Sequence, residues 1–148
     1  MLSLRIRDVM EQKALITAAP DTTVSKAAQL MARRKVGAVL VLEHNVLVGI
    51  FTERDVVFRV IAQGREARTT LLSEVMTVRP QTVDPDKSFG YALLLMHEHG
   101  FRHLPVVEND RLLGIVSARN ALDPDLEEFV AESQRRKQIQ REGGVTQG

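Results

Sequence analysis

The stretch GIFTERD (residues 49–55) returns as GIVSARN (residues 114–120), and this repetition decides the fold. The same offset of 65 residues relates other pairs of positions, namely Pro20-Asp21 to Pro85-Asp86 and Leu30-Met31 to Leu95-Met96. Of the 36 positions from 20 to 55, 11 are identical to the residue 65 positions further on. Chance at this composition gives roughly two or three identities. The chain is therefore an internal duplication.

The first copy predicts the order β-α-β-β-α. Its apolar, β-branched runs indicate strands, and hydroxyl or acidic residues before helical periodicity indicate helix starts. The expected elements are a strand at 15–18, a helix from a cap at Asp21, Thr22 or Thr23 to about Arg34, strands at 38–42 and 46–51 around a turn at 43–45, and a helix from Glu53 to about Ala62 that Thr52 caps and Gly64 ends.

The second copy predicts the same order with a shorter last helix. The expected elements are a strand near Thr82-Val83, a helix from about Lys87 to His99 that Gly100 ends, strands at 103–107 and 112–116 around a turn at 108–110, and a final helix that Pro124 interrupts after Asp123. Residues 126–140 indicate a polar, weakly amphipathic helix, and residues 143–148 a frayed end.

We expect an α+β architecture with both copies in one fold. A sheet of about three strands with helices on one side leaves an apolar face open, and the other copy is its obvious partner. The two repeats should therefore pack sheet to sheet about a pseudo-two-fold axis, which creates two equivalent clefts. The expected division is 1–66 for the first repeat, 67–124 for the second, and 125–148 for a C-terminal helix and tail.

Composition excludes several classes of protein. The 148 residues include no cysteine, so neither disulfides nor thiolate ligands are available. No apolar run approaches the roughly 18 residues of a membrane span. A net charge of +1 is too balanced for a general polyanion binder, and we interpret the basic residues 135–137 and 141 as a solvated helix face rather than a nucleic-acid or membrane site. Residues 1–12 lack the features of a secretory signal, so we expect a cytoplasmic protein.

Several motifs recur in the same order in both copies. They are Asp8-Val9-Met10 and Glu74-Val75-Met76 at an offset of 66, Thr-x-x-Pro at 17–20 and 82–85, FRHLPVV at 101–107, and GIFTERD at 49–55. Together they resemble the cystathionine-β-synthase (CBS) domain family, specifically the tandem pair called a Bateman module. The resemblance covers about residues 7–122 and implies a regulatory module without catalytic residues, whose ligand is an adenine nucleotide.

The strand-to-helix turn at Thr52 suits an anion, because the first N–H groups of a helix are unpaired. Asp55 can accept hydrogen bonds from both hydroxyls of a ribose. The resemblance implies that Thr52 and Asp55 contact phosphate and ribose; the alternative is an ordinary helix cap with an acidic first turn. In the second copy Ser117 keeps the hydroxyl, but Asn120 replaces the acid, so the second cleft should bind more weakly, bind something else, or stay empty.

The resemblance also implies that basic residues of the second copy reach the phosphates. Arg102 and His103 hold these positions, whereas the first copy has Gly37 and Ala38. The preferred site therefore joins Thr52 and Asp55 to Arg102 and His103; a surface ion pair of Arg102 with Glu98 is the alternative. Further phosphate candidates are Arg54 and Arg119, and the candidates for the adenine pocket are Ile16, Thr17, Ile50, Thr82, Pro105 and Ile115.

The chain offers little for catalysis. His97 and His99 are two residues apart on a predicted helix and point in different directions, so a metal site with His103 is not expected. Ser117 lies in no Gly-x-Ser-x-Gly motif, and neither a Walker loop nor Gly-x-Gly-x-x-Gly is present. We expect no required cofactor or metal.

The sequence thus predicts a regulatory CBS pair that senses AMP, ADP or ATP. The family commonly dimerises through its helices, so a homodimer is expected, with a target protein that the sequence does not identify. Two alternatives stay open: a structural interaction module with degenerate clefts, and a module that binds S-adenosylmethionine or NAD.

Overall fold

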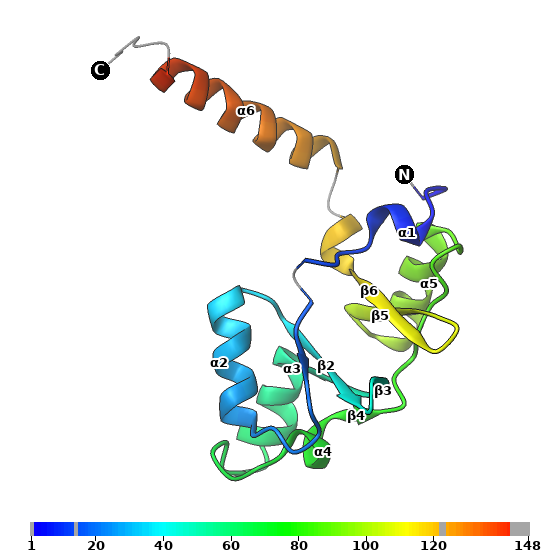
Figure 1. The fold of residues 1–148 in the computed structure, drawn as a ribbon, viewed down its shortest axis with the longest axis vertical. Helices are drawn as coiled ribbons and strands as arrows, with labels where there is room; N and C mark the ends of the chain where they lie inside the picture. Colours follow the sequence, from blue (N-terminus) through cyan, green and yellow to red (C-terminus); the bar gives the residue numbers. More distant parts are fainter. Residues whose placement is uncertain (1, 14, 122–123, 143–148) are drawn as a thin grey trace.

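A computed structural model describes residues 2–13, 15–121 and 124–142 (Figure 1). The first repeat contains β1 (Thr17–Ala18), α2 (Val24–Arg34), β2 (Ala38–Glu43), β3 (Val46–Thr52) and α3 (Glu53–Asp55), which continues into the π-helical turn η1 (Val56–Ile61). The second contains α5 (Phe89–His99), β5 (His103–Glu108), β6 (Arg111–Ser117) and the 3-10 turn η2 (Ala118–Ala121). The remaining elements are α1 (Ile6–Val9), α4 (Leu72–Val75), β4 (Thr77–Val78) and α6 (Pro124–Glu142).

The expected helices and hairpins are confirmed, with matching chemistry in the two repeats. Thr23 caps α2 by accepting a hydrogen bond from the Lys26 N–H at 3.2 Å, and Ser88 caps α5 by accepting one from the Tyr91 N–H at 3.1 Å. Each hairpin turns through two consecutive residues with positive φ, His44-Asn45 and Asn109-Asp110. This geometry suits the right-handed twist of the flanking strands.

Three details differ from the sequence-based prediction. β1 is two residues long rather than four, and Val83 forms a single parallel bridge with Val106 instead of a strand. Pro124 is the first residue of α6, a position where its missing N–H costs nothing. The tail at 143–148 lies outside the described residues. α6 extends away from the two repeats in Figure 1, and within it Glu132 pairs with Arg135 and Arg136.

The strands form two related sheets. In the first the order is β1-β2-β3-β4, with β1 parallel to β2 and the other neighbours antiparallel. In the second β5 pairs with β6, and bridges add Val83 beside β5 and Glu11 beside β6. Ala38, Leu40, Ile50 and Ile115 form a small buried core where the two sheets meet. The expected sheet-to-sheet packing is confirmed.

The leading segments of the two repeats are exchanged. Ile6 of α1 is fully buried in the core of the second repeat, together with Phe89 and Leu104. Leu72 and Val75 of α4 are buried in the core of the first repeat. Figure 1 shows α1 beside α5, and β4 pairs with β3. The division of the sequence at 66 and 67 therefore does not coincide with these two packed cores.

Among the described residues, no helix combines the length and apolarity that crossing a bilayer requires.

Candidate functional site

Two clefts lie between the repeats and are related by the duplication. The Thr52 cleft has a volume of about 740 Å³ and is lined by Thr52 at the end of β3. The Ser117 cleft, about 870 Å³, is lined by the equivalent Ser117 at the end of β6. Glu53, Arg102 and His103 line both clefts and so form a shared wall.

The Thr52 cleft brings together residues from both repeats. Its lining includes seven of the residues singled out in the sequence: Ile50, Thr52, Arg54 and Asp55 from the first repeat, with Arg102, His103 and Pro105 from the second. The hydroxyl and carboxylate thus share a cavity with basic groups that follow α5. This is the juxtaposition expected for the preferred site.

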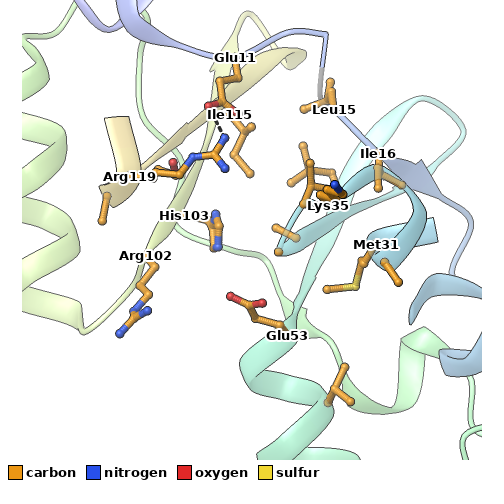
Figure 2. Close-up of a pocket in the computed structure, with 18 of the residues that line it drawn as sticks. Glu11, Leu15, Ile16, Met31, Lys35, Glu53, Arg102, His103, Ile115 and Arg119 are labelled. Carbon is orange, nitrogen blue, oxygen red and sulfur yellow. Dashed lines mark hydrogen bonds and ion pairs between the residues drawn. The ribbon is translucent and has the colours of Figure 1, made fainter. Parts of the chain in front are cut away.

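The Ser117 cleft holds a different subset. Ile16, Ile115, Ser117 and Arg119 line it, together with the shared Arg102 and His103 (Figure 2). Asn120 is not among its lining residues, although it contacts Ser117. Thr17 and Thr82 line neither cleft, so the candidates for the adenine pocket do not meet in one place.

Asp55 caps the start of α3 by accepting hydrogen bonds from Thr52. The Thr52 N–H and hydroxyl donate to Asp55 Oδ2 at 2.9 and 3.2 Å. Asp55 Oδ1 lies 3.4 Å from Arg59 Nε, one turn further along. The Asp55 side chain is only 13% exposed and lines the cleft. The cap anticipated as the alternative is therefore present, and the same carboxylate faces the cavity.

The second copy reproduces this cap with a different third partner. The Ser117 N–H and hydroxyl donate to Asn120 Oδ1 at 2.8 and 3.2 Å, nearly the distances seen at Thr52. Where Asp55 pairs with a cation, the Asn120 amide donates to Glu11 Oε1 at 3.1 Å. Arg119 Nη2 donates to the same oxygen at 3.1 Å. The polar end of the second cleft is thus organised around an acid.

His103 lies in the wall between the clefts, and Figure 2 shows it among Arg119, Arg102 and Glu53. Burial lowers the pKa of His103 below its usual value; Glu53 and Glu11 oppose this shift, and Arg102 and Arg119 add to it. A Cβ built on Gly37 would lie 3.0 Å from Glu53 Oε1 and 3.4 Å from His103 Nε2. The absence of a side chain at Gly37 leaves room for this pair.

Sequence reasoning missed two features of the clefts. The first is Glu11, which directly follows Asp8-Val9-Met10 and is equivalent to Thr77, a lining residue of the other cleft. The offset of 66 was the available signal, but it had meaning only once the exchange of leading segments was known. The second is an aromatic rim on the Thr52 cleft, where Arg54 lies 5.3 Å from the Phe58 ring centroid and His99 stacks on Phe101.

His99 belongs to this aromatic rim. Within residues 2–13, 15–121 and 124–142, no group of three or more histidine or acidic side chains is arranged to hold a metal ion.

Comparison with known proteins adds the family. The model of the CBS domain matches residues 6–62 and 72–125. The CBS domain-containing protein YhcV of Bacillus subtilis is 39% identical over 112 residues, 76% of this chain and 79% of that protein. The mitochondrial CBS domain-containing protein CBSX3 of Arabidopsis thaliana is 33% identical over 144 residues, 90% of this chain and 70% of that protein. The chain spans only 18% of the meiotically up-regulated gene 70 protein of Schizosaccharomyces pombe, at 33% identity over 84% of this chain.

Solved structures share the fold. A putative signal-transduction protein with CBS domains from Burkholderia ambifaria has a TM-score of 0.73 and 33% identity, over 78% of this chain and 86% of that one. A CBS domain protein from Pyrobaculum aerophilum, solved in complex with AMP, has a TM-score of 0.74 and 22% identity, over 87% of this chain and 99% of that one. A hexameric CBS-CP12 protein from bloom-forming cyanobacteria has a TM-score of 0.75 and 26% identity, over 97% and 90% of the two chains.

Proposed function

This chain belongs to the CBS domain family as a tandem pair, and from that premise we propose that it binds an adenine nucleotide in the Thr52 cleft. CBS pairs are regulatory modules, and in this proposal the nucleotide is a regulatory ligand rather than a substrate. AMP, ADP and ATP are the candidate ligands. The proposal includes no required cofactor and no catalytic residue.

One observation carries the proposal: the Thr52 cleft places an acid of one repeat and basic side chains of the other around a single cavity. Asp55 Oδ1 accepts hydrogen bonds from the ribose hydroxyls. Arg102 and His103 bind the phosphates, with Arg54 at the rim, because charge-assisted hydrogen bonds to phosphate are stronger than neutral ones. Ile50 and Pro105 supply apolar surface for the base.

The AMP complex of the Pyrobaculum aerophilum protein supports this class of ligand. That protein shares the fold at 22% identity, so the contacts proposed for this chain rest on its own residues. A nucleotide that touches both repeats prefers the arrangement in which both sets of groups reach it. Its binding therefore shifts the population of arrangements, which is what a regulatory signal requires.

A homodimer remains part of the proposal. Val57, Phe58 and Ile61 of η1 expose 54%, 57% and 66% of their surface, and Leu94 of α5 exposes 53%. Apolar groups on outward helix surfaces favour association with a second copy. Light scattering should give the mass of a dimer, and Ile61→Asp with Leu94→Asp should give that of a monomer.

The cytoplasmic location likewise stays a prediction.

Thermal unfolding with different ligands tests the proposed function. Protein purified free of bound ligand is heated with AMP, ADP, ATP, S-adenosylmethionine, NAD or GMP. A ligand at about 100 times its Kd stabilises the folded state by roughly 2.7 kcal/mol. An adenine nucleotide should raise the Tm and GMP should not. If no adenine nucleotide raises the Tm, the proposal fails, and a module with degenerate clefts becomes the better interpretation.

Substitution at the repeat-equivalent positions tests the asymmetry of the site. Asp55→Ala should weaken nucleotide binding more than its matched control Asn120→Ala, because only Asp55 lines the proposed site. Asp55→Asn can preserve the cap, since Asn120 makes the same cap in the second copy, and should still weaken binding through loss of the carboxylate. Calorimetric titration measures both. Equal effects of Asp55→Ala and Asn120→Ala would refute the asymmetric site.

A further inference from the structure

We propose that Glu11 is a specificity-determining residue that excludes nucleotide phosphate from the Ser117 cleft. Its carboxylate accepts hydrogen bonds from Arg119, the equivalent of Arg54, and from the amide of Asn120, the equivalent of Asp55. The module consequently binds one nucleotide per chain although it has two related clefts. This inference rests on the proposed function of the Thr52 cleft.

Glu11 and Thr77 occupy the same position in the two halves of the fold. Thr77 pairs antiparallel with Ile50 at the edge of the first sheet, and Glu11 pairs antiparallel with Ile115 at the edge of the second. Each then lines the cleft beside its partner strand. The duplication has therefore placed an acid in one cleft and a small hydroxyl side chain in the other.

Glu11 engages the two groups that correspond to the ligand-facing groups of the Thr52 cleft. Arg119 and Asn120, the equivalents of Arg54 and Asp55, both donate to Glu11 Oε1 at 3.1 Å. Arg54 instead lies over Phe58 and contacts the Gly100 carbonyl at 3.5 Å. Among the described residues, Arg54 has no carboxylate within ion-pair distance. Arg119 is thus neutralised in the Ser117 cleft, whereas Arg54 is available in the Thr52 cleft.

The backbone holds Glu11 in place. Its N–H donates to the Ile115 carbonyl at 2.8 Å, and the Ile115 N–H donates to the Glu11 carbonyl at 3.0 Å. The Glu11 carbonyl lies so close to Gly114 that a Cβ there would approach it to 2.8 Å. The Glu11 side chain is 27% exposed. A phosphate near Arg119 would therefore meet a positioned, partly buried negative charge.

Most other charges do not distinguish the two clefts. Glu53, Arg102 and His103 line both, and Lys35 of the Ser117 cleft is matched by Arg59 of the Thr52 cleft. The positions equivalent to Arg102 and His103 are Gly37 and Ala38, which carry no charge. Like charges brought together at a binding site cost several kcal/mol, so Glu11 beside Arg119 disfavours a phosphate there. In the Thr52 cleft the Asp55 carboxylate pairs with Arg59, and among the described residues Arg54 has no carboxylate within ion-pair distance.

Exchange of the two equivalent residues tests the proposal. Calorimetric titration with AMP should give one site per chain for the wild type and two for Glu11→Thr, which copies Thr77. Glu11→Gln should also gain the second site, because it removes the charge with little change of shape. The reciprocal Thr77→Glu should weaken binding in the Thr52 cleft about 100-fold.

Adenosine, which has no phosphate, distinguishes an effect of the Glu11 charge from an effect of the Glu11 volume. If Glu11 acts through its charge, Glu11→Thr should improve AMP binding in the second cleft more than adenosine binding. Equal gains for both ligands would show that the residue only fills space, and would overturn the proposal. So would a second AMP site in the wild type, or one site in both Glu11 variants.

Combining Glu11→Thr with Asp55→Ala shows which cleft contains the new site. Asp55→Ala alone should bind AMP weakly, and Glu11→Thr with Asp55→Ala should recover one site per chain. If the wild type binds AMP and Glu11→Thr adds nothing, only the present inference fails. If wild type, Glu11→Thr and Glu11→Gln all fail to bind while retaining cooperative unfolding, the proposed function and this inference fail together.

Discussion

At the scale of single residues, the two copies form similar backbone turns but differ in the charged side chain that contacts each helix cap. Thr52 with Asp55 and Ser117 with Asn120 form the same hydrogen-bonded turn. Asp55 pairs with Arg59, whereas Asn120 donates to Glu11. The replacement of Asp by Asn can be found in the sequence. Its partner Glu11 could not be found in this way, because Glu11 lies 109 positions away from Asn120 in the chain.

His103 predicts a pH dependence of stability. Burial lowers its pKa in the folded protein, so the folded state binds this proton less readily than the unfolded chain, which titrates near pH 6.5. The neutral imidazole therefore stabilises the fold above pH 6.5, and this contribution is lost as the pH falls through the lowered pKa. Urea unfolding between pH 5 and 8 should show the loss, and His103→Gln should reduce it.

The same residue predicts the opposite trend for binding. A phosphate beside His103 favours the imidazolium, so the affinity of the wild type relative to His103→Gln should increase as the pH falls from 7.5 toward 5.5, while protonation of the phosphate itself affects both proteins alike. Titration in buffers of different ionisation enthalpy should detect proton uptake. His97→Gln, at an exposed position of α5, is the matched control and should change neither profile. If His103→Gln and His97→Gln behave alike, His103 has no role at the phosphate.

At the scale of helices and strands, periodicity and capping located most elements within one or two residues. These signals are local: Thr23, Ser88, Gly100 and the positive-φ turns act on backbone groups a few residues away. The first strand of the second repeat was predicted less well, since only Val83 makes a bridge. Two-residue edge strands leave little pattern in a sequence because their pairing depends on distant partners.

Because the leading helices are exchanged, a substitution in α1 should destabilise the second repeat and a substitution in α4 should destabilise the first. Ile6→Ala and Leu72→Ala remove fully buried side chains and should each lower the free energy of unfolding by about 2–5 kcal/mol. Hydrogen exchange should then accelerate first in β5 and β6 for Ile6→Ala, and first in β2 and β3 for Leu72→Ala. Leu4→Ala, at a residue 47% exposed, is the control and should change stability by about 0.5 kcal/mol or less. Faster exchange of β2 and β3 in Ile6→Ala would contradict the exchange of helices.

At the scale of the whole molecule, this exchange joins two repeats whose sheets also meet in a small core. Each sheet gains a strand or bridge from the leading segment of the other copy. The two clefts lie on either side of the shared wall of Glu53, Arg102 and His103. A ligand in one cleft therefore contacts groups that also face the other.

The shared construction predicts a single unfolding transition. The one tyrosine of the chain, Tyr91, lies on α5, so its fluorescence reports on the second repeat. Far-UV circular dichroism reports on both repeats. Because each core contains a helix from the other copy, the two urea denaturation curves should coincide. Two separated midpoints would show that the repeats unfold independently despite the exchange.

The sequence by itself determined the duplication, the hairpins, most helices, the sheet-to-sheet architecture and the asymmetry between the two copies. Those features follow from short-range periodicity, backbone capping and the need of each apolar sheet face to be covered. Only the tertiary structure decided that α1 belongs to the core of the second repeat, that Thr17 and Thr82 line neither cleft, and that Glu11 faces Arg119 and Asn120. These outcomes depend on which distant surfaces bury each other, and residues that are neighbours in space need carry no mark of it in their local sequence.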